Sequence, residues 1–140
     1  MADVIVIGAG IIGAACAQAL ARRGLRVLVL DAGLHGATAA GMGHLLVLDD
    51  NPAELALSQY SLQRWREQAP DMPDGCAYRC NGTLWLAANA EEMAVAHSKY
   101  LNLQTQGVAC ELIARHALRA REPELRESLE GGLLINGDGI

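Results

Sequence analysis

Residues 3–31 read DVIVIGAGIIGAACAQALARRGLRVLVLD, and this stretch decides the fold of the 140-residue chain. Residues 4–7 are apolar and β-branched, which predicts a strand buried on both faces of a parallel sheet. Residues 11–23 predict a helix closed by a glycine, a residue that enters the left-handed region without a Cβ penalty. Residues 26–30 predict a second apolar strand. A strand, a helix and a second strand in this order indicate an α/β fold.

Three glycines follow the first strand in GxGxxG spacing. Gly8 permits the tight turn out of the strand, and Gly10 allows a pyrophosphate to approach the backbone. Gly13 allows the helix to pack closely on the sheet. The first helical residues, Ile11 and Ile12, lie where free N–H groups and the positive end of the helix dipole face an anion. The pattern therefore predicts a phosphate-binding turn.

An acidic residue stands at the end of the second strand, at the distance expected for a dinucleotide-binding unit. Asp31 can accept hydrogen bonds from the hydroxyls of an adenosine ribose, and its charge repels a 2′-phosphate, which argues against NADP. The next two residues, Ala32 and Gly33, are assigned to the same cofactor site. The strand, glycines, helix, second strand and acid together predict a dinucleotide site.

Two alternatives compete for this stretch. Residues 4–21 contain one strongly polar side chain, Gln18, and 15–17 resemble a small-residue cleavage site, as in a membrane helix or signal peptide. However, the start Met-Ala-Asp carries no positive charge, and three glycines interrupt the run. That alternative also leaves no place for the strand and acid that follow. The second alternative is a βαβ unit whose glycine turn holds no ligand.

Composition narrows the class of protein. Hydrophobic residues make up 51% of the chain, which indicates a globular domain rather than disorder. The net charge is −5 without a basic cluster, so we expect no nucleic-acid partner, and no later segment is apolar enough to span a membrane. The four cysteines lack metal-ligand spacing, so we expect no metal site, and they favour a reducing, cytoplasmic location. These are Cys16, Cys76, Cys80 and Cys110.

A run of small residues occupies positions 36–43 and leads into an apolar segment at 45–48. Such a run is a poor interior for a helix or strand, and it predicts a loop whose backbone approaches a ligand closely. A flexible linker is the alternative. Linkers seldom lie between a ribose-binding acid and a strand, so we favour the ligand-contacting loop.

The motif GAGIIG, the acid at Asp31 and the run ATAAGMGHL at 37–45 resemble the D-amino-acid-oxidase-like FAD oxidoreductases, with the closest similarity to D-hydroxyproline dehydrogenase β subunits and glycine oxidase-like members. The family more often has Glu at the position of Asp31, and the shorter acid can still accept ribose hydroxyls. The resemblance implies that FAD is the cofactor. It also implies that the second loop lines the flavin, with the last three residues following beside the ring: Thr38, Ala39, Ala40, Gly41, Met42, Gly43, His44 and Leu45.

The resemblance further implies an activity. It is oxidation of the CH–NH bond of a small D-amino or imino acid, such as a D-hydroxyproline-like or glycine-like substrate, by hydride transfer to flavin N5. Relatives of this type imply a hetero-oligomer with other dehydrogenase subunits, or self-association. No catalytic residue is identified, and for His44 a flavin or backbone contact is favoured over chemistry. An NAD-binding dehydrogenase domain and a non-catalytic nucleotide-binding fragment or subunit are the alternatives.

The remaining chain predicts further helices and strands. A helix capped by Asn51 should present an apolar face, and Asn81-Gly82 should form a hairpin-like turn before a strand at 83–87. A second helix, capped by Asn89, should end near Gln106. A strand at 108–113, a helix at 114–121 and a strand at 133–135 should follow. The apolar face of the first helix is Leu55, Leu62, Trp65 and Ala69.

This half resembles the point at which the family enters its substrate domain. We therefore predict a Rossmann-type FAD-binding part at 1–75 and the incomplete start of an α+β substrate domain at 76–140. The isolated chain should show weak or absent turnover, because the family's substrate-clamping residues lie beyond it. Unpartnered apolar residues should leave sheet edges exposed and promote self-association. These residues are Leu133, Leu134, Ile135 and Ile140.

Overall fold

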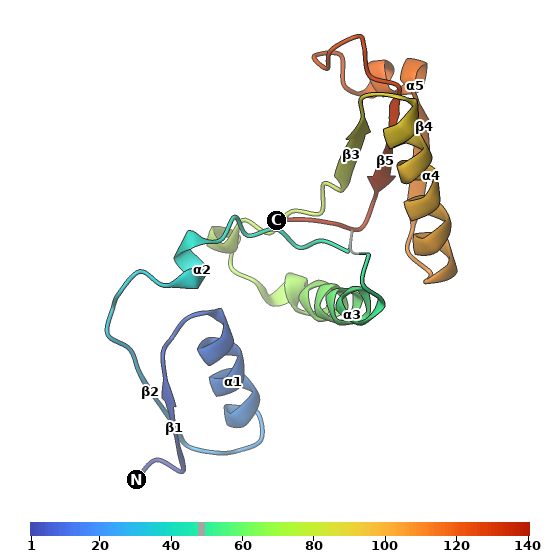
Figure 1. Cartoon of the computed structure of the whole chain (residues 1–140). Helices are drawn as coiled ribbons and strands as arrows, with labels where there is room; N and C mark the ends of the chain where they lie inside the picture. Colours follow the sequence, from blue (N-terminus) through green and yellow to red (C-terminus); the bar gives the residue numbers. More distant parts are fainter. Residues whose placement is uncertain (48–49) are drawn as a thin grey trace. The chain divides into compact units, whose positions relative to one another are not determined.

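The structure is a computed structural model that describes residues 1–47 and 50–140. The chain forms two compact units, residues 1–43 and 44–140 (Figure 1). The predicted apolar segment at 45–48 lies partly outside the described residues. Leu45 makes an isolated antiparallel bridge to Gly139, within the second unit.

The first unit is built on a parallel βαβ arrangement. Strand β1 (Val4–Ile7) leads into helix α1 (Ile11–Ala21), and strand β2 (Val27–Leu30) returns beside β1. The two strands are parallel and in register from Val4 opposite Val27 to Ile7 opposite Leu30. Gly24 has a φ of +83°, as predicted for the residue that closes the helix. The predicted order of strand, helix and second parallel strand is confirmed.

One prediction for β1 is wrong, because the strand is covered on one face only. Ile7 is 87% exposed and Ile5 is also exposed, whereas Val6 lies on the side of α1. In register, Ile5 and Ile7 lie opposite Leu28 and Leu30, which are exposed too. Among the described residues, α1 covers one face of this two-stranded sheet and the other face remains apolar and open.

The run of small residues after β2 is not entirely a loop. Residues Ala37–Ala40 form a short helix, α2, with Gly36 at its N-cap and Gly41 at its C-cap. Alanine is the strongest helix former, and the two glycines delimit the turn. The prediction of an irregular segment therefore fails at 37–40, where three of the four residues are alanine.

The second unit begins with a long helix, α3 (Pro52–Gln68). The side chain of Asn51 accepts hydrogen bonds from the backbone N–H groups of Ala53 (2.9 Å) and Glu54 (3.4 Å), which confirms the predicted cap. Two short 3₁₀ turns follow, η1 (Ala69–Asp71) and η2 (Asp74–Cys76). They connect α3 to the segment that leads into β3.

The rest of the second unit is a three-stranded antiparallel sheet with helices. Its strands are β3 (Thr83–Ala87), β4 (Cys110–Ala114) and β5 (Gly131–Ile135), in the spatial order β3-β5-β4. Helix α4 (Ala90–Thr105) connects β3 to β4, and α5 (Arg115–Arg121) follows β4. These elements were expected, and their bounds differ by a few residues at most.

The hairpin expected at Asn81-Gly82 is absent from the described residues. Gly82 does have a positive φ of +81°, yet β3 pairs with the distant strand β5 rather than with the segment before it. The backbone N–H of Gly82 donates instead to the carbonyl of Asp138 (3.0 Å). The turn conformation of Gly82 therefore serves a long-range hydrogen bond here and not a hairpin.

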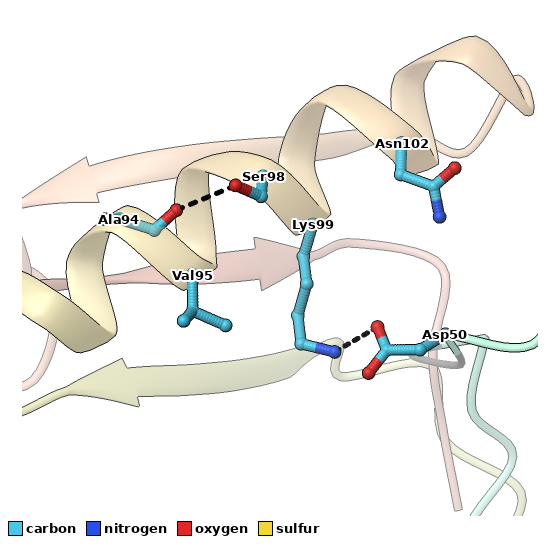
Figure 2. A pocket seen from close by; sticks show the side chains of 6 residues that line it. All are labelled: Asp50, Ala94, Val95, Ser98, Lys99 and Asn102. Carbon is cyan, nitrogen blue, oxygen red and sulfur yellow. Dashed lines mark hydrogen bonds and ion pairs between the residues drawn. The ribbon is translucent and has the colours of Figure 1, made fainter.

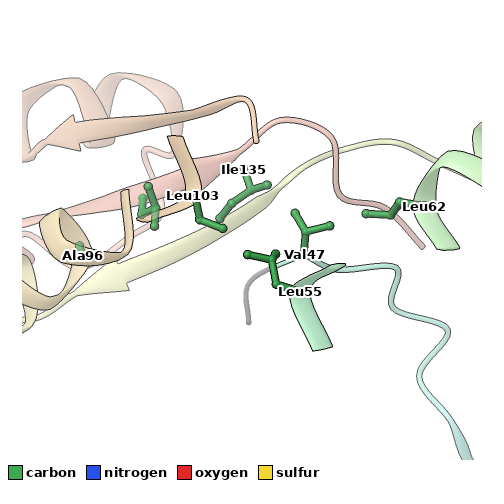
Figure 3. Close-up of a cluster of buried hydrophobic side chains, with 7 residues drawn as sticks. Val47, Leu55, Leu62, Ala96, Leu103 and Ile135 are labelled. Atoms are coloured by element: carbon green, nitrogen blue, oxygen red, sulfur yellow. The ribbon is translucent and has the colours of Figure 1, made fainter. Parts of the chain in front are cut away.

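The main core lies between α3, α4 and this sheet, and Figure 3 draws its buried side chains. Leu133 and Ile135 of β5 are fully buried, because β5 is the central strand with a partner on each side. The prediction of exposed edges at these residues is wrong, although Ile140 is exposed. The cluster consists of Val47, Leu55, Leu62, Ala96, Leu103, Leu133 and Ile135.

Trp65 is half-buried on the face of α3 that was expected to be apolar. Its ring stacks on that of Tyr78, with 6.5 Å between ring centroids and 13° between ring planes. Together with the buried Leu55 and Leu62, this contact confirms that the apolar face of α3 packs against other parts of the second unit. Trp65 therefore serves packing, as the sequence indicated.

Candidate functional site

A hollow of about 740 Å³ opens in the first unit at the carboxyl end of the two strands. Its floor is the turn between β1 and α1, and Asp31 lies beside it at the end of β2. One further wall is the segment 34–39, which includes the start of α2. In open parallel sheets, the crevice outside the carboxyl ends of the strands is where ligands bind.

Backbone conformation and close contacts favour glycine at the positions of the turn. Gly8 has a φ of +98°, a conformation that favours glycine. A Cβ at Gly13 would lie 1.9 Å from the carbonyl oxygen of Gly8, so the first turn of α1 sits directly against the backbone that leaves β1. A Cβ at Gly10 would lie 3.1 Å from Oγ1 of Thr38. Gly8 and Gly10 thus place no side chain at the floor of the hollow, and Gly13 allows α1 to pack against the backbone that leaves β1.

Asp31 is tied to the glycine turn. Its Oδ2 accepts a hydrogen bond from the N–H of Ala9 (2.6 Å), and its Oδ1 accepts one from the N–H of Gly33 (2.7 Å). These two bonds lower the pKa of the Asp31 carboxyl below its usual range, the Ala9 bond having the larger effect. An ionised carboxylate offers about four lone pairs, so acceptor capacity remains for ligand hydroxyls.

Thr38 joins the second segment of the site to the start of α1. Its Oγ1 accepts a hydrogen bond from the backbone N–H of Ile11 (3.0 Å), one of the groups that a helix leaves unpaired in its first turn. The resemblance implied a flavin contact for Thr38. The structure instead places its hydroxyl at the glycine turn, where it ties α2 to the start of α1.

The predicted cofactor residues are thus partly gathered around this hollow. Those that line it are Gly8, Gly10, Ile11, Ile12, Gly13, Asp31, Thr38 and Ala39. The neighbouring Ala32, Gly33, Ala40, Gly41, Met42 and Gly43 belong to the same unit without lining it. Their roles stay predictions.

His44 and Leu45 belong to the second unit. There they line a separate hollow of about 280 Å³, together with Ser58 and Ser61 of α3. A contact of His44 or Leu45 with a cofactor therefore stays a prediction.

Sequence reasoning missed several residues of the first hollow. Ala9 was passed over because its contribution is a backbone N–H, which side-chain patterns do not reveal. His35 is exposed and lines the hollow, although no pattern in the sequence singles it out. Cys16 lies one helical turn after Gly13 and is exposed at the same hollow. The helical spacing from Gly13 was a usable signal for Cys16.

Other features of the described residues suggest no competing site. A hollow of about 400 Å³ on α4 is shallow, and Figure 2 shows its Lys99 paired with Asp50 across it. Within 1–47 and 50–140, no group of three His, Cys, Asp or Glu residues could hold a metal ion. In the same ranges, no helix is both long and apolar enough to cross a membrane. The hollow at the glycine turn is therefore the candidate site.

Comparison with known proteins agrees with this geometry. Residues 3–140 match the family described as FAD dependent oxidoreductase (DAO). The fold matches glycine oxidase from Geobacillus kaustophilus with a TM-score of 0.85 and 26% identity, over 99% of this chain and 40% of that one. It matches iminodiacetate oxidase from Chelativorans sp. BNC1 with a TM-score of 0.76 and 25% identity, over 97% of this chain and 40% of that one.

A curated relative is the tRNA 5-methylaminomethyl-2-thiouridine biosynthesis bifunctional protein of Polaromonas sp. (strain JS666). It is 37% identical over 102 residues, which are 69% of this chain and 15% of that protein. The chain therefore spans less than half the length of the relatives it matches.

Proposed function

Because this chain belongs to the family of FAD-dependent oxidoreductases, whose cofactor is FAD, we propose that its glycine turn and Asp31 hold the ADP half of that cofactor. The observation that carries the proposal is the bare turn itself. Its backbone lies open to the hollow, and Gly13 leaves no room for a side chain against Gly8. A pyrophosphate needs such a surface, since it is bound by backbone N–H groups at a helix N-terminus. The family match overturns the alternative of a plain NAD-binding domain.

Asp31 would hold the adenosine ribose. Its carboxylate is kept ionised by the N–H groups of Ala9 and Gly33, and it retains lone pairs that can accept ribose hydroxyls. The same two hydrogen bonds fix the carboxylate beside the glycine turn. The ribose and the pyrophosphate would therefore be bound by one preorganised element.

The flavin half would run along the second segment. In our proposal, Thr38 marks the point where the pyrophosphate gives way to the ribityl chain, because its hydroxyl already contacts the N–H of Ile11. The bare glycine and alanine backbone after Thr38 suits close approach of a planar ring. Residues 39–45 would follow the flavin, with His44 and Leu45 beside the ring. We also propose that 1–75 belongs to the FAD-binding part and 76–140 to the start of the substrate domain.

The reaction that we propose for the whole protein is oxidation of the CH–NH bond of a small amino or imino acid. Glycine oxidase and iminodiacetate oxidase, the matched structures, are named for substrates that carry an amine next to a carboxylate-bearing carbon. When bound, FAD would supply the acceptor for the hydride that leaves this carbon. This chain contributes the positioning, since hydride transfer depends on alignment more than on an acid–base residue.

The substrate class is narrower in our proposal than in the family. We propose a glycine-like or D-hydroxyproline-like molecule, processed in the cytoplasm by a protein that self-associates or works with other dehydrogenase subunits. The relative from Polaromonas carries the name of a tRNA-modifying protein. The net charge of −5 argues against direct binding of a polyanion by this chain, so we favour a small-molecule substrate.

A binding experiment tests the cofactor proposal. The purified chain is titrated with FAD, and quenching of flavin fluorescence is followed. ADP should compete with FAD, because it carries the pyrophosphate and ribose, whereas FMN should not. NADP should compete poorly, because Asp31 repels its 2′-phosphate. Tight binding of FMN, or no competition by ADP, would contradict the assigned site.

A second experiment tests the reaction. The FAD-loaded chain is assayed for amine-dependent dye reduction. The substrates are glycine and iminodiacetate, which the names of the matched structures give, and D-proline. We expect weak or absent turnover by the 140 residues alone and turnover once the remaining family segments are supplied by fusion to a relative. Retained FAD without turnover in such a fusion would favour the non-catalytic alternative.

A further inference from the structure

Residues 137–140, which we call the clasp, run between two other segments of the second unit. Gly139 exchanges two backbone hydrogen bonds with Leu45, at 2.8 and 2.9 Å. Ile140 exchanges two with Arg79 on the other side, at 2.8 and 2.9 Å. The clasp thereby fastens 45–47 to the segment that leads into β3.

Asp138 lies at the centre of the clasp and is fully buried, with 0% of its surface exposed. Its Oδ1 accepts a hydrogen bond from the N–H of Val47 (3.0 Å), and its backbone carbonyl accepts one from Gly82 (3.0 Å). Among the described residues it is the buried charged side chain. Burying a carboxyl group is costly unless its hydrogen bonds compensate, so a residue of this kind calls for an explanation.

The glycines on either side of Asp138 are in close contact with other segments, with backbone at Gly139 and with the end of the Arg66 side chain at Gly137. A Cβ at Gly137 would lie 2.2 Å from Nη2 of Arg66, and one at Gly139 would lie 2.3 Å from the carbonyl oxygen of Arg79. Arg66 also donates from Nη2 to the carbonyl of Gly137 (2.8 Å). The clasp is thus held from α3 and from the segment before β3 at once.

The segment that the clasp fastens is the direct continuation of the proposed flavin loop. Val47 is anchored in the main core, where Figure 3 shows it beside Leu55 of α3, and His44 immediately precedes the paired residue Leu45. We propose that Asp138 is a positioning residue for the cofactor, which fixes His44 and Leu45 through its hydrogen bond to Val47. This inference rests on the proposed function.

The surroundings of Asp138 fit a structural hydrogen-bond acceptor rather than a group that takes part in the reaction. Burial raises the pKa of its carboxyl, while hydrogen bonds from Thr83 and Val47 and the charge of Arg66 act in the opposite direction. Asparagine has the same shape and keeps the acceptor for the N–H of Val47. Asp138→Asn should therefore preserve the clasp, whereas Asp138→Ala removes the acceptor and leaves a buried N–H unpaired.

The test compares the two variants with a control variant that is expected to lose a similar amount of stability. Leu118→Ala serves as the control, because Leu118 is buried in a separate cluster with Ile113 and Leu129. Amide hydrogen exchange at Leu45 and Val47 is measured in the 140-residue chain, together with FAD affinity by fluorescence titration. For Asp138→Ala we expect exchange at these amides and the FAD dissociation constant to rise about tenfold. Asp138→Asn should restore both to within about threefold.

The outcomes separate this inference from the proposed function. If the wild-type chain binds FAD and Asp138→Ala binds it equally well, the positioning role is wrong while the cofactor site stands. If Leu118→Ala weakens FAD binding as much at the same loss of thermal stability, the effect is general destabilisation and the positioning role is again wrong. If the wild-type chain binds no FAD, the proposed function falls, and the cofactor role of the clasp falls with it.

Discussion

Gly13→Ala should disrupt the cofactor site through a single methyl group. The added Cβ would lie 1.9 Å from the carbonyl oxygen of Gly8, whereas ordinary contacts begin at 3.4 Å. The obstacle is backbone on both sides, so α1 must withdraw by about 1.5 Å, the difference between these two distances. Overpacking of this kind costs about 1–3 kcal/mol. It also moves the N–H groups at the start of α1 away from the phosphates.

The loss of FAD affinity can be worked out from those N–H groups. A hydrogen bond to a charged partner contributes about 1.5–3 kcal/mol, so losing one weakens binding by about 10- to 150-fold. Gly24→Ala is the matched control, since Gly24 lies at the other end of α1 and a Cβ there meets nothing within 4 Å. Its φ of +83° makes alanine unfavourable by about 1–2 kcal/mol, so stability falls without a change in the turn.

The assay is a fluorescence titration with FAD, combined with thermal unfolding of the wild type and both variants. We expect both variants to unfold at lower temperature and Gly13→Ala alone to lose FAD affinity. Wild-type affinity in Gly13→Ala would refute the reasoning, because it would mean that the contact between Gly13 and Gly8 does not shape the site. An equal loss in Gly24→Ala would refute it as well, by pointing to general destabilisation.

Three further outcomes follow from the structure. Asp31→Ala should weaken FAD binding about tenfold or more. Ionised Asp31 stabilises the folded site above its usual pKa of 3.8, and this contribution is lost as the pH falls through its lowered folded-state pKa. FAD binding by the wild type should therefore weaken in this acid range, and Asp31→Ala should not show that weakening. Burial raises the folded-state pKa of Asp138, so its stabilising effect is complete below 3.8 and declines as the pH rises through the folded-state value. Urea unfolding at several pH values should show a smaller decline in Asp138→Asn. Leu133→Ala should cost about 2–5 kcal/mol in thermal unfolding, against less than about 0.5 kcal/mol for the half-exposed Leu101→Ala; equal effects would contradict the central position of β5.

The first 31 residues specify their own structure because their signals are local. Strand, glycine turn, helix and acid each depend on neighbours within a few residues, so the βαβ arrangement could be predicted from them. The family resemblance could be predicted from them together with the run at 37–45. The caps at Asn51 and Asn89 were predictable for the same reason, since each side chain bonds N–H groups two or three residues away.

The features that escaped prediction depend on distant partners. The pairing of β5 between β3 and β4 cannot be seen in the alternation of any one strand. Leu133 and Ile135, which were expected at an exposed edge, are buried for that reason. The hydrogen bond from Ile11 to Thr38 spans 27 positions, and that from Val47 to Asp138 spans 91. The open face of β1 was not predicted because the described residues supply no partner for it. An apolar pattern shows that a strand can be covered, but it does not show by what.

The order of the strands in the second unit has a consequence for synthesis on the ribosome. β5 is the last of the three strands to leave the ribosomal tunnel, yet it is the one that both others need as a partner. Until residues 131–135 emerge, β3 and β4 have no ladder to join, and α4 has no completed sheet to pack on. The strand pairing that the described residues show in the first unit lies within residues 4–30, so it can form early. We expect the nascent chain to carry a folded glycine turn while the second unit is still open and dependent on chaperones.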